Sequence, residues 1–348
     1  MEPTGTQTAR SDDVRAMILA AGLGSRLRPL TNYRAKPALP VQGRPVVSLL
    51  LELLAHNGVD QVLINLHHLP ETIRDAVAGD HPEGMTIRWS EEPRPLGTGG
   101  GIRRAAGFLS GSDDCIVMAG DMLLDVDLSR LLALHRRSGR DVTLILREDS
   151  RGRDFGTIGI DARGLLTRIG KREVSQSSDR DRSVGPEQRK GLFTGVRFFS
   201  NTALSGWPTL DCPQSANAAQ DAAQEVAFED LRDWLAPRIE AGEILVGAEI
   251  VDGTTSVWEP VGTPAEYLDV NLCPPCLPSL GGDVKTWGGD LRPSPTEDGN
   301  VIAGSAEVPA DASLDHCVVW DRERVPDGFR GRDGVYAGNA FHPCRSPE

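Results

Sequence analysis

The apolar run from Ala16 to Ala21 limits the possible folds of this chain more than any other feature, because it leads directly into a glycine loop. A continuous apolar run of this length is typical of a strand buried on both faces, as in a parallel sheet. Gly22 and Gly24 follow at once, and glycine lets a backbone approach a ligand closely and direct N–H groups at phosphate. The sequence therefore predicts a ligand loop at the carboxyl end of a buried strand.

Basic side chains follow the glycines closely. Such a cluster favours a polyanionic ligand, most simply a nucleoside triphosphate, over a plain structural turn. The loop is not a Walker loop, which needs Gly-Lys-Ser/Thr, and Leu27 stands where a dinucleotide fingerprint needs its third glycine. A dinucleotide-dependent oxidoreductase is thereby disfavoured. The four cations lie within eleven positions: Arg26, Arg28, Arg34 and Lys36.

Strand and helix patterns alternate after the loop, which predicts a doubly wound, Rossmann-like α/β fold with a mixed, mostly parallel sheet. Ligands of such sheets bind beyond the carboxyl ends of the strands. Asp127 is expected to cap the helix that follows it, whereas Asp125 is left without a role. The expected strands cover residues 59–65, 85–89, 115–119 and 141–147, and the expected helices cover 46–56, 70–78, 102–108 and 128–135.

Residues 22–31 (GLGSRLRPLT) and 36–41 (KPALPV) resemble the signature of the sugar-1-phosphate nucleotidylyltransferases, or NDP-sugar pyrophosphorylases. The chain looks most like the mannose-1-phosphate guanylyltransferases among them, and the resemblance extends to about residue 270. It implies an enzyme that joins an NTP and a sugar 1-phosphate, releasing pyrophosphate and forming an NDP-sugar. It also implies Mg²⁺ as the cofactor.

The resemblance assigns catalytic roles to three residues. Arg26 would hold the β- and γ-phosphates, Lys36 would offset charge at the α-phosphorus, and Asp121 would hold Mg²⁺ at the end of a central strand. The glycines at 97–101 are expected to open the helix at 102–108 and to turn its first N–H groups toward the ligand, unless they form a plain flexible loop. The nucleotide-binding residues would be Leu19, Ala20, Ala21, Gly22, Gly24, Ser25, Gly97, Thr98, Gly99 and Gly100.

Sugar-phosphate binding is implied by resemblance for a second set of residues. Lys171 stands where the family carries a lysine, although Gly170 and Arg172 replace the usual Glu-Lys-Pro neighbours. Thr194 and Gly195 match a family strand that packs against the sugar. Glu229 is a further candidate for the sugar hydroxyls, and a plain helix N-terminal charge is the equal alternative.

Residues 257–264 (VWEPVGTP) depart from the family at one position. The family's Trp-x-Asp-hydrophobic-Gly-Thr-Pro segment supplies a second Mg²⁺ ligand, and here that position is Pro260, whose side chain cannot coordinate a cation. Glu259 is the substitute candidate, although on a strand it would face the other way unless a bulge intervenes. This departure supports a second hypothesis, a non-catalytic regulatory subunit that binds an NDP-sugar.

The base and the sugar are not fixed by the sequence. The segment at 97–100 most resembles guanylyltransferases that act on mannose- or heptose-type 1-phosphates. A UTP-dependent sugar-1-phosphate uridylyltransferase is the alternative.

A net charge of −13 argues against general binding to nucleic acid or to a membrane surface. No apolar stretch approaches the roughly 20 residues of a membrane span, and the polar residues 1–13 are expected to be a disordered tail.

Six dispersed cysteines fit reduced thiols in a cytoplasmic protein. Cys273 and Cys276 have metal-knuckle spacing, which leaves a zinc site open.

The composition changes after residue 270, so we expect a nucleotidyltransferase domain at 14–270 and a separate region at 271–348. Three prolines between 274 and 278 mark a linker. Ile302, Val308 and Leu314 are spaced six apart, and the segment resembles the short left-handed β-helix tail of many family members. So few rungs should pack on the first domain or on another subunit, so a homo-oligomer is expected.

Overall fold

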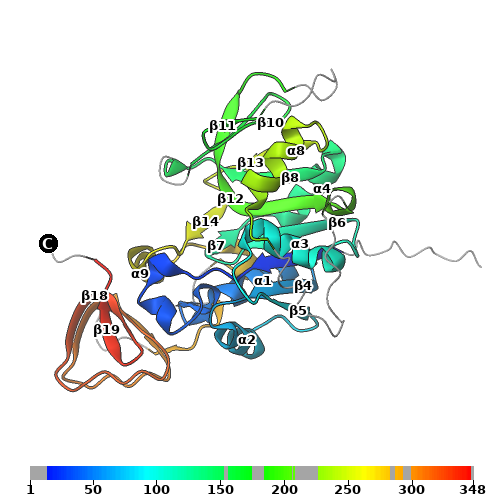
Figure 1. Cartoon of the computed structure of the whole chain (residues 1–348). Coiled ribbons are helices and arrows are strands. Elements are labelled where there is room, and N and C mark those ends of the chain that lie inside the picture. The colour runs from blue at the N-terminus through cyan, green and yellow to red at the C-terminus, as the bar shows by residue number, and fades with distance from the viewer. Residues whose placement is uncertain are drawn as a thin grey trace, which may run out of the picture.

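The computed structural model describes residues 14–152, 156–174, 184–205, 207, 226–282, 287–292 and 299–345. The expected N-terminal tail lies outside these residues. A large sheet with helices on both faces forms the body of the molecule, and a smaller C-terminal sheet lies beside α9 (Pro264–Leu272) (Figure 1).

The large sheet confirms the predicted mixed, doubly wound architecture. Its main path runs β11-β10-β9-β12-β6-β1-β4-β5, with β8 added on β12 and β13 on β8. Neighbours along β6-β1-β4-β5 are parallel, whereas β12 is antiparallel to β6, β8 and β9. The strands are β1 (Arg15–Leu19), β4 (Gln61–Leu66), β5 (Thr86–Glu91), β6 (Asp114–Ala119), β8 (Val142–Arg147), β9 (Ile158–Ile160), β10 (Leu166–Ile169), β11 (Arg172–Glu173), β12 (Arg189–Ser200) and β13 (Val246–Val251).

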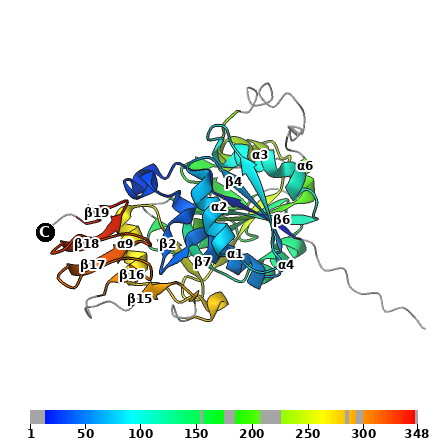
Figure 2. The ribbon, with the colours of Figure 1, turned by 90° about the horizontal axis from the view of Figure 1, so that it is seen from below.

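Side chains of the central strand β1 alternate between two cores, because successive residues of a strand face opposite sides. Ala16 and Ile18 belong to one core and Met17 to the other. Burial on both faces explains the unbroken apolar run of this strand. Figure 2 shows helices on either side of the sheet. The first core takes in α1 (Val46–His56), α2 (Pro70–Gly79) and α4 (Leu128–Ser138), and the second takes in α3 (Gly97–Leu109), α6 (Asn201–Ser205) and α8 (Ala236–Glu240).

Two short pairs of strands complete the first part of the chain. β7 (Met122–Asp125) pairs with β14 (Val257–Pro260), and β2 (Pro40–Val41) pairs with β3 (Arg44–Pro45). Asp125, whose role the sequence left open, accepts hydrogen bonds from the N–H and the hydroxyl of Ser279, each at 2.8 Å. This contact fixes the chain just after α9, in the short helical turn η5 (Pro278–Leu280).

The C-terminal sheet runs β15-β16-β17-β18-β19. Its inner neighbours β16, β17 and β18 are parallel, and the two outer strands are antiparallel. Ile302 and Leu314 are buried in a small core of this sheet, with Val308 packed against it. The left-handed β-helix expected here stays a prediction. The strands are β15 (Leu291–Arg292), β16 (Val301–Ala303), β17 (Ser313–Val319), β18 (Arg330–Ala337) and β19 (Ala340–Pro343).

The outer face of this sheet packs on the rest of the chain. Trp320 and Val335 share one apolar core with Val41 and with Tyr267 of α9. The expected packing of the tail on the first part of the chain is therefore observed. Of the helices that the structure describes, none is long and apolar enough to cross a membrane.

Replacing Asp127 with alanine should lower the free energy of unfolding by about 1 kcal/mol, because its carboxylate caps α4. Asp127 Oδ1 accepts the Arg130 N–H at 2.8 Å, as predicted from the sequence. Urea denaturation measures the loss. Asp127→Asn keeps an acceptor and should stay within about 0.5 kcal/mol of the wild type; an equal loss in both variants would contradict the cap.

Candidate active site

The carboxyl ends of four parallel strands meet at one edge of the large sheet. Ala20 follows β1, Asn65 lies near the end of β4, Glu92 follows β5, and Asp121 follows β6. A cavity of about 640 Å³ opens at this edge and is lined by all four of these residues. Its volume lies within the range of sites that bind small molecules.

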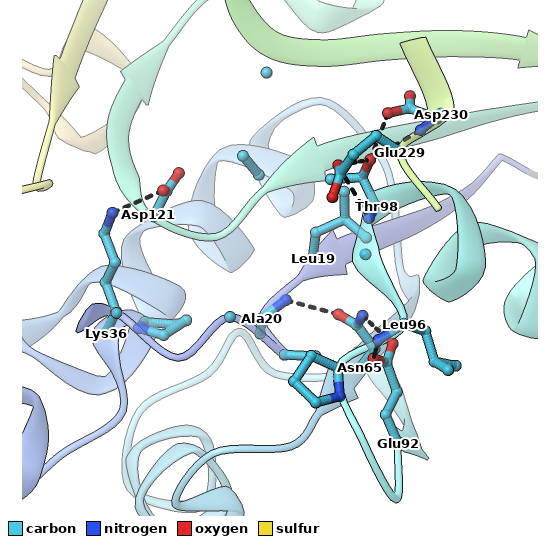
Figure 3. A pocket seen from close by; sticks show the side chains of 18 of the residues that line it. Leu19, Ala20, Lys36, Asn65, Glu92, Leu96, Thr98, Asp121, Glu229 and Asp230 are labelled. Atoms are coloured by element: carbon cyan, nitrogen blue, oxygen red, sulfur yellow. Dashed lines mark hydrogen bonds and ion pairs between the residues drawn. The ribbon is translucent and has the colours of Figure 1, made fainter. Parts of the chain in front are cut away.

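Asn65 and Glu92 tie three strand ends together beneath the cavity (Figure 3). Asn65 Oδ1 accepts the Ala20 N–H at 2.7 Å, and Asn65 Nδ2 donates to Glu92 Oε1 at 2.7 Å. Glu92 Oε2 accepts the Leu96 N–H at 3.0 Å, just before α3. Both side chains are buried, so the network fixes the backbone just before the glycine loop at Gly22 and just before the glycines of α3. Sequence analysis missed this network, although a polar residue near the end of an apolar strand was a signal.

Lys36, Asp121 and Arg26 lie at one end of the cavity, where Arg26 adds a positive charge to the Lys36–Asp121 pair. Lys36 Nζ lies 2.8 Å from Asp121 Oδ2, and their side chains are 11% and 45% exposed. Lys36 begins the 3-10 turn η3 (Lys36–Ala38), and Arg26 lines the same cavity from the turn η1 (Ser25–Leu27). All three predicted catalytic residues are thus brought together.

Two of the four clustered cations do not line this cavity in the described part of the chain. Arg28 is exposed, and Arg34 Nη2 instead lies 2.5 Å from Asp321 Oδ1 of the C-terminal region. Arg26 and Lys36 therefore line the cavity, whereas Arg34 forms an ion pair that connects two parts of the fold.

Gly24 shapes the loop beside Lys36. Its φ is +59°, and a Cβ at this position would lie 2.8 Å from Thr31 Cγ2 and 3.3 Å from Lys36 Cβ. The Thr31 hydroxyl donates to the Gly24 carbonyl at 2.9 Å. A side chain at position 24 would therefore push apart the turn that carries Lys36.

Helix α3 begins at Gly97, earlier than expected, and its glycines make room for the chain at Phe228. A Cβ on Gly97 would lie 2.5 Å from the Phe228 carbonyl, and a Cβ on Gly99 would overlap the Phe228 ring. The Phe228 carbonyl accepts the N–H groups of Gly99 and Gly100 at 2.9 and 3.4 Å. The expectation that the first N–H groups of this helix face the ligand therefore does not hold for Gly99 and Gly100, whose N–H groups donate to Phe228.

Thr98, Glu229 and Asp230 form the opposite, carboxylate end of the cavity (Figure 3). The Thr98 hydroxyl lies 2.7 Å from Glu229 Oε2 and 2.6 Å from Asp230 Oδ1. Glu229 precedes the π-helical turn η4 (Asp230–Leu235) without capping it through its side chain. Both predictions for Glu229, a contact to the sugar hydroxyls and a helix N-terminal charge, stay open, because a charge beside a helix N-terminus needs no hydrogen bond to it.

Asp230 also forms an ion pair with Arg197 of β12, which sequence analysis missed. Arg197 Nε lies 2.7 Å from Asp230 Oδ2, and the side chains are only 2% and 3% exposed. Arg197 Nη1 donates to the Gly195 carbonyl at 3.0 Å. The pair cancels its own charge, so Glu229 adds the negative charge at this end.

The remaining predicted residues divide into two groups. Leu19, Ala21, Gly22, Ser25, Gly97 and Gly195 line the cavity together with the residues already placed there. Gly99, Gly100, Lys171, Thr194 and Glu259 do not line it in the part of the chain that the structure describes.

Three of the residues outside the cavity have other surroundings. Lys171 is exposed in the turn between β10 and β11. Thr194 is buried, and its hydroxyl donates to the Ile145 carbonyl at 2.8 Å. Glu259 Oε2 accepts from Arg151 Nη1 at 2.7 Å. The structure thus does not bring Glu259 into the cavity with Asp121.

No group of three or more His, Cys, Asp or Glu side chains gathers as a metal site among the described residues. Cys273 and Cys276 are exposed free thiols. Asp121 keeps nearly half of its side-chain surface open, so a cation shared between this carboxylate and a bound phosphate fits the cavity.

Comparisons with known proteins agree with this geometry. Residues 15–174 match the family model described as Nucleotidyl transferase. A mannose-1-phosphate guanylyltransferase of Mycobacterium tuberculosis is 27% identical over 324 residues, covering 90% of this chain and 82% of that protein. A UTP--glucose-1-phosphate uridylyltransferase of Synechocystis sp. is 34% identical over 349 residues, covering 93% and 87%.

A solved structure shares the fold. The crystal structure of HddC from Yersinia pseudotuberculosis complexed with GMP-PN superposes with a TM-score of 0.55 at 22% identity, covering 74% of this chain and 98% of that one.

Replacing Arg197 with methionine should lower the free energy of unfolding by about 3 kcal/mol, because it leaves the buried Asp230 carboxylate unpaired. Urea denaturation at neutral pH measures the loss. The double variant with Asp230→Asn removes the orphaned charge and should recover more than half of it. An equally unstable double variant would show that the ion pair is not what Arg197 contributes.

Proposed function

The chain belongs to the nucleotidyl transferase family, and we propose that it joins an NTP and a sugar 1-phosphate to give an NDP-sugar and pyrophosphate. One observation carries the proposal. A single cavity holds the Lys36–Asp121 pair and Arg26 at one end, and the Glu229 carboxylate at the other. Two substrates, each with phosphate and hydroxyl groups, need such a division of charge.

The reaction asks little covalent chemistry of the protein. An oxygen of the sugar 1-phosphate forms a bond to the α-phosphorus of the NTP, and the bond to the β-phosphate breaks to release pyrophosphate. The protein aligns the two polyanions and offsets their charge. Arg26 would hold the β- and γ-phosphates, and Lys36 would offset the charge that grows at the α-phosphorus and the leaving pyrophosphate.

We propose GTP and a mannose- or heptose-type 1-phosphate as the substrates, with UTP as the alternative nucleotide. The similarity to a mannose-1-phosphate guanylyltransferase across most of both chains supports the first choice. The similarity to a uridylyltransferase supports the alternative. Glu229, held by Thr98, would accept hydrogen bonds from sugar hydroxyls. Lys171 is proposed for the sugar phosphate, which requires the β10–β11 turn to approach the cavity.

Mg²⁺ is the proposed cofactor, and Asp121 is the residue that would hold it. When bound, it would neutralise phosphate charge that Lys36 and Arg26 leave uncompensated. Glu259 could join Asp121 only after leaving Arg151, so Asp121 with substrate phosphates is the simpler ligand set.

A regulatory subunit without catalysis is the second candidate, because Pro260 replaces the family's second metal-binding aspartate. The assembled Arg26, Lys36 and Asp121 favour catalysis over this alternative, because binding an NDP-sugar alone needs no group for the leaving pyrophosphate.

We also propose that the protein is a cytoplasmic homo-oligomer.

Lys36→Ala should lower kcat by at least about 10²-fold while the thermal unfolding midpoint stays close to that of the wild type. The lost ammonium group can no longer offset charge in the transition state. Pyrophosphate release from GTP and mannose 1-phosphate measures turnover. Lys190→Ala removes an exposed lysine of β12 outside the cavity and should leave turnover unchanged. A folded Lys36→Ala variant with wild-type kcat would refute the assignment.

Asp121→Asn should raise the Mg²⁺ concentration for half-maximal turnover at least tenfold, because an amide is a weaker ligand than a carboxylate. Chelation of divalent cations should abolish wild-type turnover. Glu259→Gln is the matched control, with an expected shift below twofold. A larger shift for Glu259→Gln than for Asp121→Asn would move the metal site to Glu259.

A further inference from the structure

Two aromatic residues outside the cavity, Trp320 and Tyr267, contact the chain just before and just after the turn that carries Lys36. On one flank, the Arg34 guanidinium lies 4.8 Å from the centre of the Trp320 ring. On the other, the Pro40 carbonyl accepts the Tyr267 hydroxyl at 2.6 Å. Trp320 Nε1 donates to the same hydroxyl at 2.8 Å, so the two aromatic residues connect the two flanks of the turn. We call these four residues the aromatic tie.

Burial makes the tie strong. Trp320 and Tyr267 are 2% and 0% exposed, so water cannot replace their hydrogen bonds. Burial also raises the pKa of Tyr267, so its hydroxyl stays protonated at neutral pH and donates to Pro40 while accepting from Trp320. Removing that one hydroxyl would leave the Pro40 carbonyl and the Trp320 N–H unpaired.

The C-terminal region contacts the Arg34 flank at two more places. Asp321 forms an ion pair with Arg34. Tyr33 packs on His342, with ring centres 5.7 Å apart, and a Cβ on Gly338 would overlap the Tyr33 ring. Residues just after β17, in the β18–β19 turn and in β19 therefore all contact Tyr33 or Arg34, two to three positions before Lys36.

The members of the tie do not line the cavity in the part of the chain described, so any effect that they have on a bound substrate is indirect. Ala35 is held from the other side, because its N–H donates to Thr72 of α2 at 3.0 Å. Lys36 is thus fixed between α2 and the C-terminal region. A displacement of about 1 Å in a catalytic group can cost about a hundredfold in rate.

We propose that Trp320 and Tyr267 are positioning residues for Lys36, through which the C-terminal sheet sets the phosphate end of the cavity. The proposal rests on the proposed function only for its kinetic readout. Its binding readout uses inorganic tripolyphosphate, which the phosphate end should bind whatever the base and sugar are.

Tyr267→Phe should lower kcat about tenfold and weaken tripolyphosphate binding about fivefold in the otherwise wild-type chain, with a smaller change in the KM for the sugar 1-phosphate. Tyr336→Phe makes the same substitution in the C-terminal sheet away from the turn, and should change neither value by more than twofold. Calorimetry gives the binding constant, and pyrophosphate release gives the rate.

The Lys36→Ala background separates positioning from a general structural role. If the tie acts through Lys36, Tyr267→Phe should change tripolyphosphate binding and residual turnover by less than twofold once Lys36 is absent. Equal losses with and without Lys36 would overturn the proposal, as would no loss in either background.

Asp321→Asn provides a second variant if Tyr267→Phe does not fold. It should weaken tripolyphosphate binding about threefold, and only in the presence of Lys36. Asp315→Asn breaks the exposed pair with Arg332 on the same sheet and is the matched control. Equal effects of the two substitutions would overturn the proposal.

Separate results refute the positioning role of Trp320 and Tyr267 and the proposed nucleotidyl transfer. A wild-type protein that binds tripolyphosphate but turns over no substrate pair would refute the function, and the binding cycle would still decide the positioning. A wild-type protein that does not bind tripolyphosphate has no phosphate end for the tie to set, which would overturn the proposal as well.

Discussion

The ion pair between Lys36 and Asp121 is the contact around which the active-site cavity is arranged. The Lys36 side chain is only 11% exposed, and the Asp121 carboxylate, two residues after β6, lies opposite its ammonium group. Gly24, α2 and the aromatic tie fix Lys36 from three sides. The contact is also open to a ligand, because Asp121 is still 45% exposed. An incoming phosphate can therefore compete with Asp121 for Lys36.

Buried polar contacts arrange the rest of the cavity around this pair. Asn65 and Glu92 join the ends of β1, β4 and β5, while the Arg197–Asp230 pair places Thr98 and Glu229 at the far end. Asn65, Glu92, Arg197 and Asp230 are buried, so losing one of them leaves an unpaired polar group with little access to water. The cavity is therefore rigid at its base, and its two ends differ in charge before any substrate arrives.

Local patterns predicted β1, β4, β5, β6 and β8, helices α1, α2 and α4, and the Asp127 cap. The family resemblance pointed to Arg26, Lys36 and Asp121, which the structure places at one cavity. These features depend on neighbours within a few positions, which a single sequence displays. The missed features join distant positions: Thr98 and Glu229 are 131 residues apart, and Tyr267 and Trp320 are 53 apart. The packing of Phe228 on the backbone of the α3 glycines was missed for the same reason, because no residue near these glycines in the sequence indicates it.

Phosphorus NMR of the purified protein with Mg²⁺, GTP or UTP, and a panel of hexose and heptose 1-phosphates tests the central claim most directly. For one productive pair, the resonances of an NDP-sugar and of pyrophosphate should appear in equal amounts as those of the two substrates decline. That result would establish nucleotidyl transfer and show that Pro260 is compatible with it. Binding of nucleotide or NDP-sugar without product across the whole panel would contradict catalysis and favour the regulatory subunit.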